Sequence, residues 1–375
     1  MLRLINFLVP KNRKMIYLRS HYEYRDNIHS ILDELLLHSL EHKYSIVCDG
    51  IAFNNYSSNK LIKPKNRIML FYYFLRSKYV FFDGGIYGQM SPIKRQILVN
   101  TWHGVSLKKI GYHIQGYNKN SNKRLATYLT VYSDFFVENM SKAFGVPKSD
   151  VLITGEPRND QFFRTSFGES LKKINIEKNT YNKVIIWMPT YRKHKITKET
   201  DGNTYLYGIP FVSDLIQLNV LLKEYNVLLI VKLHGLEENS ESLEYSNIRY
   251  ITSIELGKSN LSVNELLVDC DALITDYSSV YINYLLLNRQ ICFAYDDMEE
   301  YKSNRGFMFK DVESIMPGFH AKNYSDIEKF IMKIVEDSDA YENIRNGVNS
   351  LLNKYTDGKN SLRILQFLNI ISEDK

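Results

Sequence analysis

Residues 97–104 read Ile-Leu-Val-Asn-Thr-Trp-His-Gly, and residues 227–235 read Val-Leu-Leu-Ile-Val-Lys-Leu-His-Gly. Each stretch is a short, almost unbroken apolar run that ends on His-Gly, which is typical of a strand buried in a parallel sheet. Open α/β sheets bind their ligands at the carboxyl ends of such strands. The two stretches therefore predict parallel sheets with an imidazole at the ligand-binding edge.

The rest of the chain supports this reading, because short apolar strands alternate with amphipathic helices in both halves. This β-α-β order predicts an α/β protein with two doubly wound domains that face each other across a cleft. We expect the following strands: 14–20, 44–48, 79–82, 97–104, 130–132, 151–155, 184–188, 227–233, 272–275 and 291–294. We expect helices at 26–40, 133–144, 211–225, 263–268, 278–287 and in the region after residue 325.

The chain of 375 residues is longer than one typical core, which favours two domains of roughly 150 to 200 residues each. The polar segment from Gly168 to Asn182 contains the expected boundary. We therefore predict an amino-terminal domain at 1–170 and a carboxy-terminal domain at 171–375, with the option that the terminal helix packs back on the first domain.

Composition excludes several classes of protein. The three cysteines, Cys48, Cys270 and Cys292, are odd in number and lack metal-ligand spacing, so neither a disulfide framework nor a zinc site is expected. The tightest apolar run, Ile68 to Leu75, is far shorter than the roughly 20 residues that span a bilayer, and the amino terminus does not resemble a secretory signal. We expect a protein of the cytoplasm, soluble or peripheral to a membrane.

Positive charge is concentrated in one region. The net charge is only +6, yet residues 51–133 contain thirteen Lys or Arg and one acidic residue, Asp83. Such a region attracts anionic lipid or polyphosphate, although it can also be an ordinary solvated face. Nucleic acid is not expected as a partner, because no nucleic-acid-binding motif accompanies the charge.

Polar side chains follow three strands of the second half, where they could bind a diphosphate. The strand at 272–275 runs into Asp276, Ser278 and Ser279 at the start of a helix, where free N–H groups favour an anion. Lys232 and His234 end a second strand, and Arg192 follows a third. Singly, each pattern is more often a capped helix or a surface residue; together they favour a diphosphate site.

His103 ends the first quoted strand, in the basic half of the chain. At the edge of the sheet its imidazole could accept the proton of an attacking hydroxyl group. A buried histidine bonded to backbone is the alternative. The other seven histidines lack a comparable setting: His21, His29, His38, His42, His113, His194 and His320.

Taken together, the motifs resemble those of the CDP-glycerol glycerophosphotransferase family of teichoic-acid and capsule polymerases. The resemblance runs from about residue 97 to 365 and rests on motifs that occur in the family's order. They are 101–111 (TWHGVSLKKIG), 155–160 (GEPRND), 188–192 (MPTYR), 232–234 (KLH), 273–280 (LITDYSSV), 305–307 (RGF), 317–318 (PG) and 357–358 (DG).

The resemblance implies a GT-B fold of two Rossmann-like domains, the first for the acceptor and the second for a CDP-alditol, with no metal or other cofactor. It makes His103 the expected catalytic base and places His234 at the donor diphosphate. The other residues that it implies in substrate binding are Gly104, Arg158, Asn159, Asp160, Thr190, Arg192, Lys232, Thr275, Asp276, Ser278, Ser279 and Arg305.

The chain departs from the family pattern at two places. Gly235 stands where members commonly have Pro, and Val105-Ser106 replaces the usual Thr-Pro, so loop shape is in question. The length is close to the minimal catalytic unit, which favours a primase-like or single-addition enzyme, or one repeat-unit step in capsule synthesis.

The expected reaction is transfer of glycerol phosphate from CDP-glycerol to a hydroxyl of a lipid-linked glycan or teichoic-acid or capsule acceptor, with release of CMP. CDP-ribitol remains an alternative donor. A GT-B nucleotide-sugar glycosyltransferase or epimerase and a non-catalytic, basic membrane-surface or polyanion-binding protein remain alternative functions. The apolar and basic residues of 1–14 are expected to hold the enzyme on the inner face of the cell membrane. The sequence leaves the oligomeric state open.

Overall fold

The computed structural model describes residues 2–22, 24–87, 91–114, 123–190, 212–232, 245–295 and 297–372. These residues form two compact units. The first consists of Met1–Val105, Lys109–Arg164 and Leu351–Lys375, and the second of Ser106–Lys108 and Thr165–Ser350. Three residues between the first two segments of the first unit, Ser106–Lys108, therefore belong to the second unit.

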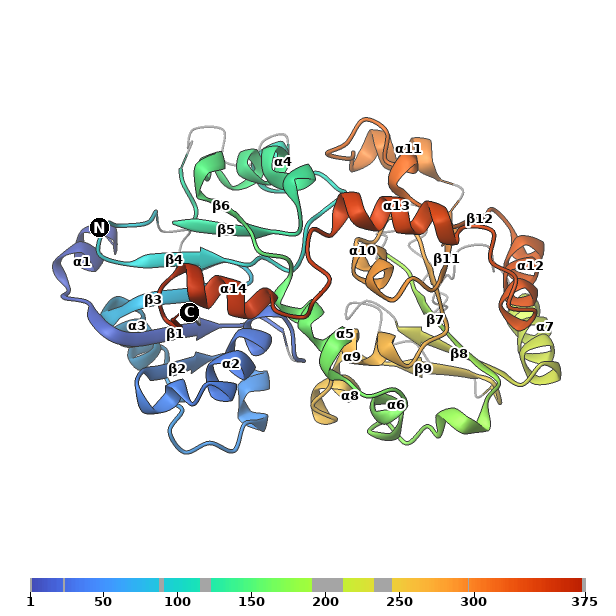
Figure 1. The fold of residues 1–375 in the computed structure, drawn as a ribbon, viewed down its shortest axis with the longest axis horizontal. Coiled ribbons are helices and arrows are strands. Elements are labelled where there is room, and N and C mark those ends of the chain that lie inside the picture. Colours follow the sequence, from blue (N-terminus) through green and yellow to red (C-terminus); the bar gives the residue numbers. More distant parts are fainter. Residues whose placement is uncertain are drawn as a thin grey trace. The chain divides into compact units, whose positions relative to one another are not determined.

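A six-stranded, all-parallel sheet in the order β2-β1-β3-β4-β5-β6 forms the centre of the first unit (Figure 1). Its strands are β1 (Asn12–Arg19), β2 (Ser45–Asp49), β3 (Ser77–Phe82), β4 (Ile97–Asn100), β5 (Tyr128–Val131) and β6 (Val151–Ile153). Its helices are α1 (Leu2–Leu8), α2 (Asn27–Leu37), α3 (Arg67–Arg76), α4 (Asp134–Phe144), α5 (Gln161–Arg164) and α14 (Asn360–Phe367).

Apolar side chains cover both faces of this sheet, as is typical of parallel sheets. Ile16 and Leu18 of β1 pack in one cluster with residues of α2 and with Ile364 and Leu365 of α14. Tyr17, which alternates to the other face, contacts Phe74 of α3 edge-to-face. The chain's last helix therefore covers the sheet of the first unit (Figure 1).

The second unit repeats the arrangement, with six parallel strands in the order β12-β11-β10-β7-β8-β9. They are β7 (Lys183–Met188), β8 (Val227–Lys232), β9 (Ile248–Ile251), β10 (Ala272–Thr275), β11 (Gln290–Ala294) and β12 (Phe319–Ala321). The helices are α6 (Glu169–Lys172), α7 (Val212–Glu224), α8 (Ser253–Lys258), α9 (Val263–Val268), α10 (Val280–Tyr284), α11 (Met298–Asn304), α12 (Tyr324–Val335) and α13 (Glu342–Leu352). Side chains of α7 and α12 complete the core on one face of this sheet.

All the strands expected from sequence are present within one or two residues, except at the first His-Gly run. There β4 ends at Asn100, three residues before His103. The elements that the sequence did not predict include β9, β12 and α3. The apolar run at 68–75 is α3, and its exposed Ile68, Met69 and Tyr72 explain why it shows no clear helical stripe.

The division of the chain differs from the simple cut at 170/171. The first unit gives way to the second after Arg164, and Leu351–Lys375 belongs to the first unit, as in the option that the terminal helix packs back. No helix in the described part of the chain is long and apolar enough to cross a membrane.

Candidate functional site

Three neighbouring strands of the first unit end side by side. Arg19 of β1 pairs with Phe82 of β3, and Phe82 pairs with Asn100 of β4. The polar residues that follow each strand, His21, Asp83 and His103, therefore lie at one edge of the sheet. This is the edge at which α/β sheets bind ligands.

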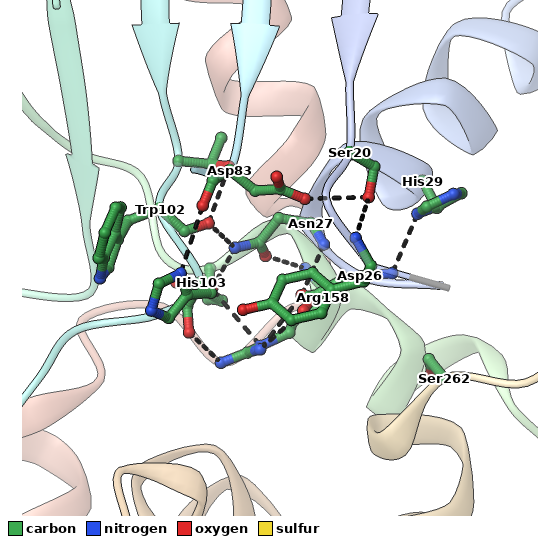
Figure 2. A network of polar contacts seen from close by, with 12 residues as sticks. Ser20, Asp26, Asn27, His29, Asp83, Trp102, His103, Arg158 and Ser262 are labelled. Atoms are coloured by element: carbon green, nitrogen blue, oxygen red, sulfur yellow. Dashed lines mark hydrogen bonds and ion pairs between the residues drawn. The ribbon is translucent and has the colours of Figure 1, made fainter. Parts of the chain in front are cut away.

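His103 is fixed by one of these neighbours. Its Nδ1 lies 3.3 Å from the backbone carbonyl oxygen of Asp83, and because a carbonyl only accepts, Nδ1 donates (Figure 2). Nε2 then carries a lone pair and can accept a proton. Burial, the largest effect, lowers the pKa of His103 to about 4, although Asp26 opposes the shift. The imidazole is therefore neutral at physiological pH, as a base must be.

The backbone before His103 is in an unusual conformation. Trp102 has a φ of 51°, in the left-handed region that bulky residues rarely adopt. Asn27 Nδ2 donates to its carbonyl oxygen at 3.1 Å, and its ring packs on Phe144 with centroids 4.9 Å apart. These contacts hold the turn that presents His103.

Gly104, expected to bind substrate, has a conformational role in this turn. Its φ of 98° favours glycine, and a Cβ atom would lie 2.5 Å from Arg158 Nη2 and 2.9 Å from the Tyr132 hydroxyl. Glycine therefore lets the backbone pass against the Arg158 side chain.

Arg158 lies in a largely buried ion cluster beneath the turn (Figure 2). Its guanidinium donates to both Asp26 oxygens, at 3.1 and 3.2 Å, and to the carbonyl oxygen of His103 at 3.1 Å. Nε lies 3.4 Å from Glu156, which also accepts from Asn27. Burial raises the pKa of Glu156 to about 7 against the attraction of Arg158. The geometry favours a role for Arg158 in positioning His103.

Asp160 and Asn159, also expected at the substrate, are buried. The Asp160 carboxylate accepts from the backbone N–H groups of Asn360 at 2.8 Å and Ser361 at 2.9 Å, at the start of α14. Negative charge is favourable at a helix amino terminus. The geometry thus favours a structural role for Asp160, which attaches the last helix to the first unit.

The strand ends of the second unit also meet at one edge, because Met188 of β7 pairs with Thr275 of β10. The Thr275 hydroxyl donates to the Met188 carbonyl oxygen at 2.7 Å. Thr190 donates its N–H and its hydroxyl, the latter at 2.5 Å, to the Asp276 carboxylate. Asp276 and Thr275 are buried, so they join the strand ends and hold Thr190 in place.

Lys108 adds a cation to this edge. Its Nζ lies 3.3 Å from the Thr190 hydroxyl and 5.9 Å from the centre of the Tyr301 ring. The N–H of Met308 donates to the carbonyl oxygen of Leu107, which attaches the segment to the second unit. The Ser106 hydroxyl donates to the Lys108 carbonyl oxygen at 2.9 Å and accepts from its N–H at 3.1 Å. Ser106 therefore shapes the Lys108 loop.

The remaining expected residues differ in setting. Lys232 ends β8 and is buried, with Nζ 3.0 Å from the Ser253 hydroxyl. Ser278 and Ser279 are partly exposed before the five-residue helix α10, and Arg305 is exposed after α11. Arg192 and His234 lie outside the described residues.

Sequence reasoning missed Asp26, Asp83, His21 and Lys108. Asp83 and His21 each follow an expected strand, so the strand-end rule that selected His103 applies to them as well. Among the residues that the structure describes, no three His, Cys, Asp or Glu side chains could hold a metal ion. A metal-free reaction stays a prediction.

Comparisons with known proteins agree on one family. A family model described as CDP-Glycerol:Poly(glycerophosphate) glycerophosphotransferase matches residues 1–369. The teichoic acid glycerol-phosphate primase of Bacillus subtilis strain 168 is 31% identical over 329 residues, which are 83% of this chain and 80% of that protein. The teichoic acid poly(ribitol-phosphate) polymerase of Bacillus spizizenii W23 is 29% identical over 96% of this chain, which spans only 56% of that longer protein.

The fold has a similar counterpart among solved structures. The wall teichoic acid polymerase TagF superposes with a TM-score of 0.78 and 20% identity, covering 98% of this chain and 92% of the TagF chain. The expected GT-B fold of two Rossmann-like domains is confirmed by this match and by the two parallel sheets.

Proposed function

We propose a mechanism and an acceptor from one premise: the chain belongs to the CDP-glycerol:poly(glycerophosphate) glycerophosphotransferase family. It is a transferase of teichoic-acid biosynthesis that moves glycerol phosphate from CDP-glycerol to an acceptor hydroxyl. The proposed acceptor is a lipid-linked teichoic-acid precursor, reached at the membrane surface.

The setting of His103 supports this proposal most strongly. An acceptor hydroxyl attacks the phosphorus that bears glycerol, a new O–P bond forms, and the bond from that phosphorus to the bridging oxygen breaks. CMP leaves with the electron pair, and His103 Nε2 takes the hydroxyl proton. Nδ1, which donates to Asp83, fixes the orientation of the ring for this step.

At the donor, positive charge and hydrogen-bond donors would stabilise the diphosphate. We assign Lys108, Lys232, Ser278 and Ser279 to this task, because they lie at or next to the strand ends of the second unit. Arg192, His234 and Arg305 remain proposed on the family motifs alone. Such preorganised contacts to the leaving group supply much of the rate in phosphoryl transfer.

Nucleotide release tests the function. Purified protein is incubated with CDP-glycerol, CDP-ribitol or UDP-sugars, each with and without a soluble lipid-linked glycan that ends in glycerol phosphate. We expect acceptor-dependent CMP release from CDP-glycerol. Faster release from CDP-ribitol would favour the ribitol alternative, which the Bacillus spizizenii relative supports. Release of UDP alone would disprove the proposal.

Lys108→Met is expected to raise the KM for CDP-glycerol by about tenfold, because a charged hydrogen bond to the diphosphate contributes about 1.5 kcal/mol or more. Lys109→Met is the matched control, since Lys109 is the exposed neighbour of Lys108 and belongs to the other unit. Steady-state kinetics with varied donor measure both. Equal KM values for the two variants would remove Lys108 from the donor site.

We also propose that α1 attaches the enzyme to the anionic cytoplasmic face of the membrane. Leu4 and Leu8 of α1 are 62% and 67% exposed although they are apolar. Arg3 lies on the same helix, and the Arg95 guanidinium sits 5.4 Å from the centre of the Phe7 ring. Exposed apolar side chains next to basic ones are typical of interfacial helices.

Leu4→Gln/Leu8→Gln is therefore expected to reduce binding to vesicles that contain anionic lipid by roughly tenfold or more, from the lost apolar burial. Ile216→Gln/Val220→Gln on α7 is the control, because these residues share the spacing and are 54% and 61% exposed. Vesicle sedimentation at low and high salt measures the binding. The membrane proposal fails if the α1 variant binds as well as the control variant.

A further inference from the structure

A second histidine lies at the same sheet edge as His103. His21 Nδ1 is 2.9 Å from Asp83 Oδ1, and the backbone N–H of His21 donates to the same oxygen at 3.1 Å. The Ser20 hydroxyl donates to Asp83 Oδ2 at 3.0 Å (Figure 2). The carboxylate of Asp83 is buried, whereas the His21 side chain is 37% exposed. The ring is thus held on one side and open on the other.

Asp83 therefore orients both histidines, His21 through its carboxylate and His103 through its carbonyl oxygen. Because Nδ1 of each ring is committed as a donor to Asp83, Nε2 of each neutral ring is an acceptor. Both rings are neighbours at the sheet edge, because their Nδ1 atoms lie 2.9 Å and 3.3 Å from oxygen atoms of the same residue, Asp83. The sheet edge thus presents two hydrogen-bond acceptors, Nε2 of His21 and Nε2 of His103. Deprotonation of one acceptor hydroxyl requires only one of them.

We propose that His21, held by Asp83, is an acceptor-binding and specificity-determining residue, whose Nε2 accepts a hydrogen bond from a second hydroxyl beside the one that His103 deprotonates. The proposal rests on the function proposed above. It identifies the acceptor as a polyol end with two neighbouring hydroxyl groups, as sugars and alditols have. A site that binds a hydroxyl by hydrogen bond disfavours an analogue that lacks it.

The space around Gly84 offers a way to move His21 without changing a titratable group. A Cβ on Gly84 would lie 2.6 Å from Nδ1 and 2.8 Å from Cε1 of His21, so alanine there pushes the ring away from Asp83. A Cβ on the adjacent Gly85 would meet nothing within 4 Å. Gly84→Ala and Gly85→Ala therefore form a matched pair.

The control for His21→Gln is His38→Gln. His38 Nε2 lies 3.2 Å from the buried carboxylate of Glu34, and its side chain is 38% exposed, so the pair resembles His21–Asp83 away from the sheet edge. Melting temperatures establish that all variants are folded before kinetics are compared.

The experiment compares two acceptors, one ending in a vicinal diol and the other lacking the second hydroxyl, with whichever CDP-alditol the wild type turns over. We expect the wild type to prefer the diol about tenfold or more in kcat/KM. His21→Gln and Gly84→Ala should lose about tenfold on the diol, keep their rate on the deoxy acceptor, and so lose the preference. Gly85→Ala and His38→Gln should match the wild type.

Two outcomes would overturn the inference: a preference retained in His21→Gln, or equal losses on both acceptors in His21→Gln and Gly84→Ala. The double variant His21→Gln/Gly84→Ala should have the same kcat/KM on the diol acceptor as His21→Gln. In the double variant the methyl group added at residue 84 has no imidazole to displace. If the wild type turns over no CDP-alditol, the proposed function itself fails. If the wild type turns over a CDP-alditol and the variants keep the preference for the diol acceptor, only the role of His21 fails.

Discussion

Replacing His103 with alanine is expected to lower kcat by about 10²- to 10⁴-fold, the usual contribution of a general base. The KM for CDP-glycerol should change little, because the proposed proton transfer concerns the acceptor hydroxyl. Acceptor-dependent CMP release measures the effect. His113→Ala is the control, since His113 also bonds a backbone carbonyl, that of Asn139, at 3.0 Å. Full turnover by folded His103→Ala protein would end the assignment of His103 as the base.

His103 also determines how kcat/KM and stability are expected to depend on pH. Because the pKa of His103 lies at about 4, its neutral form persists well below the ordinary histidine value of about 6.5. The acid limb of kcat/KM should therefore fall below pH 6. Between about pH 6.5 and 4 the unfolded chain binds more protons at His103 than the folded chain, so stability falls as pH falls. If kcat/KM of folded protein were half-maximal at pH 6.5, the lowered pKa of His103 would be contradicted.

Arg158→Gln is expected to lower the free energy of unfolding of the first unit by about 3 to 5 kcal/mol. Removing one partner leaves Asp26 and Glu156 buried without their cation, which is more costly than losing an exposed ion pair. The melting temperature should fall by roughly 10 °C. Activity should fall as well, because the guanidinium also holds the carbonyl oxygen of His103.

Arg249→Gln is the comparison for this effect. Arg249 pairs with Glu255 at 2.6 Å on the surface of the second unit, and exposed pairs contribute about 1 kcal/mol or less. Thermal and urea unfolding of both variants provide the measurement. If Arg158→Gln melts within about 2 °C of Arg249→Gln, the cluster is not the structural element that its burial indicates.

Much of the fold could be predicted, because strands buried on both faces are short apolar runs that stand out against polar turns. The elements that were missed break that pattern. In β9, only Ile248 and Ile251 are buried, Arg249 is exposed and Tyr250 is partly buried, and α3 exposes Ile68 and Met69. A strand with so few buried residues leaves only a weak apolar run in the sequence, and a helix whose apolar residues face the solvent leaves no amphipathic pattern.

The site was harder to predict, because residue type does not show what a side chain contacts. Asp160 and Asp276 occur in motifs that resemble a binding site, yet both accept hydrogen bonds from their own chain. His21 and Asp83 meet only because β1 and β3 are neighbours, although 62 residues separate them in sequence. The order of strands in a sheet is a property of the tertiary structure, and it cannot be predicted from the apolar pattern of a single strand.

The position of α14 also bears on the order in which the protein is built. The sheet of the first unit is complete once Ile153 has been synthesised, but part of the apolar cover over it, Ile364 and Leu365, follows some two hundred residues later. At roughly 5 to 20 residues per second the ribosome needs at least about ten seconds for that stretch. Apart from Ser106–Lys108, the second unit is one continuous segment that is made within that interval. The half of the enzyme that is translated first is therefore the half that is finished last, and a nascent chain carries an incompletely covered sheet that chaperones can bind until its last helix emerges.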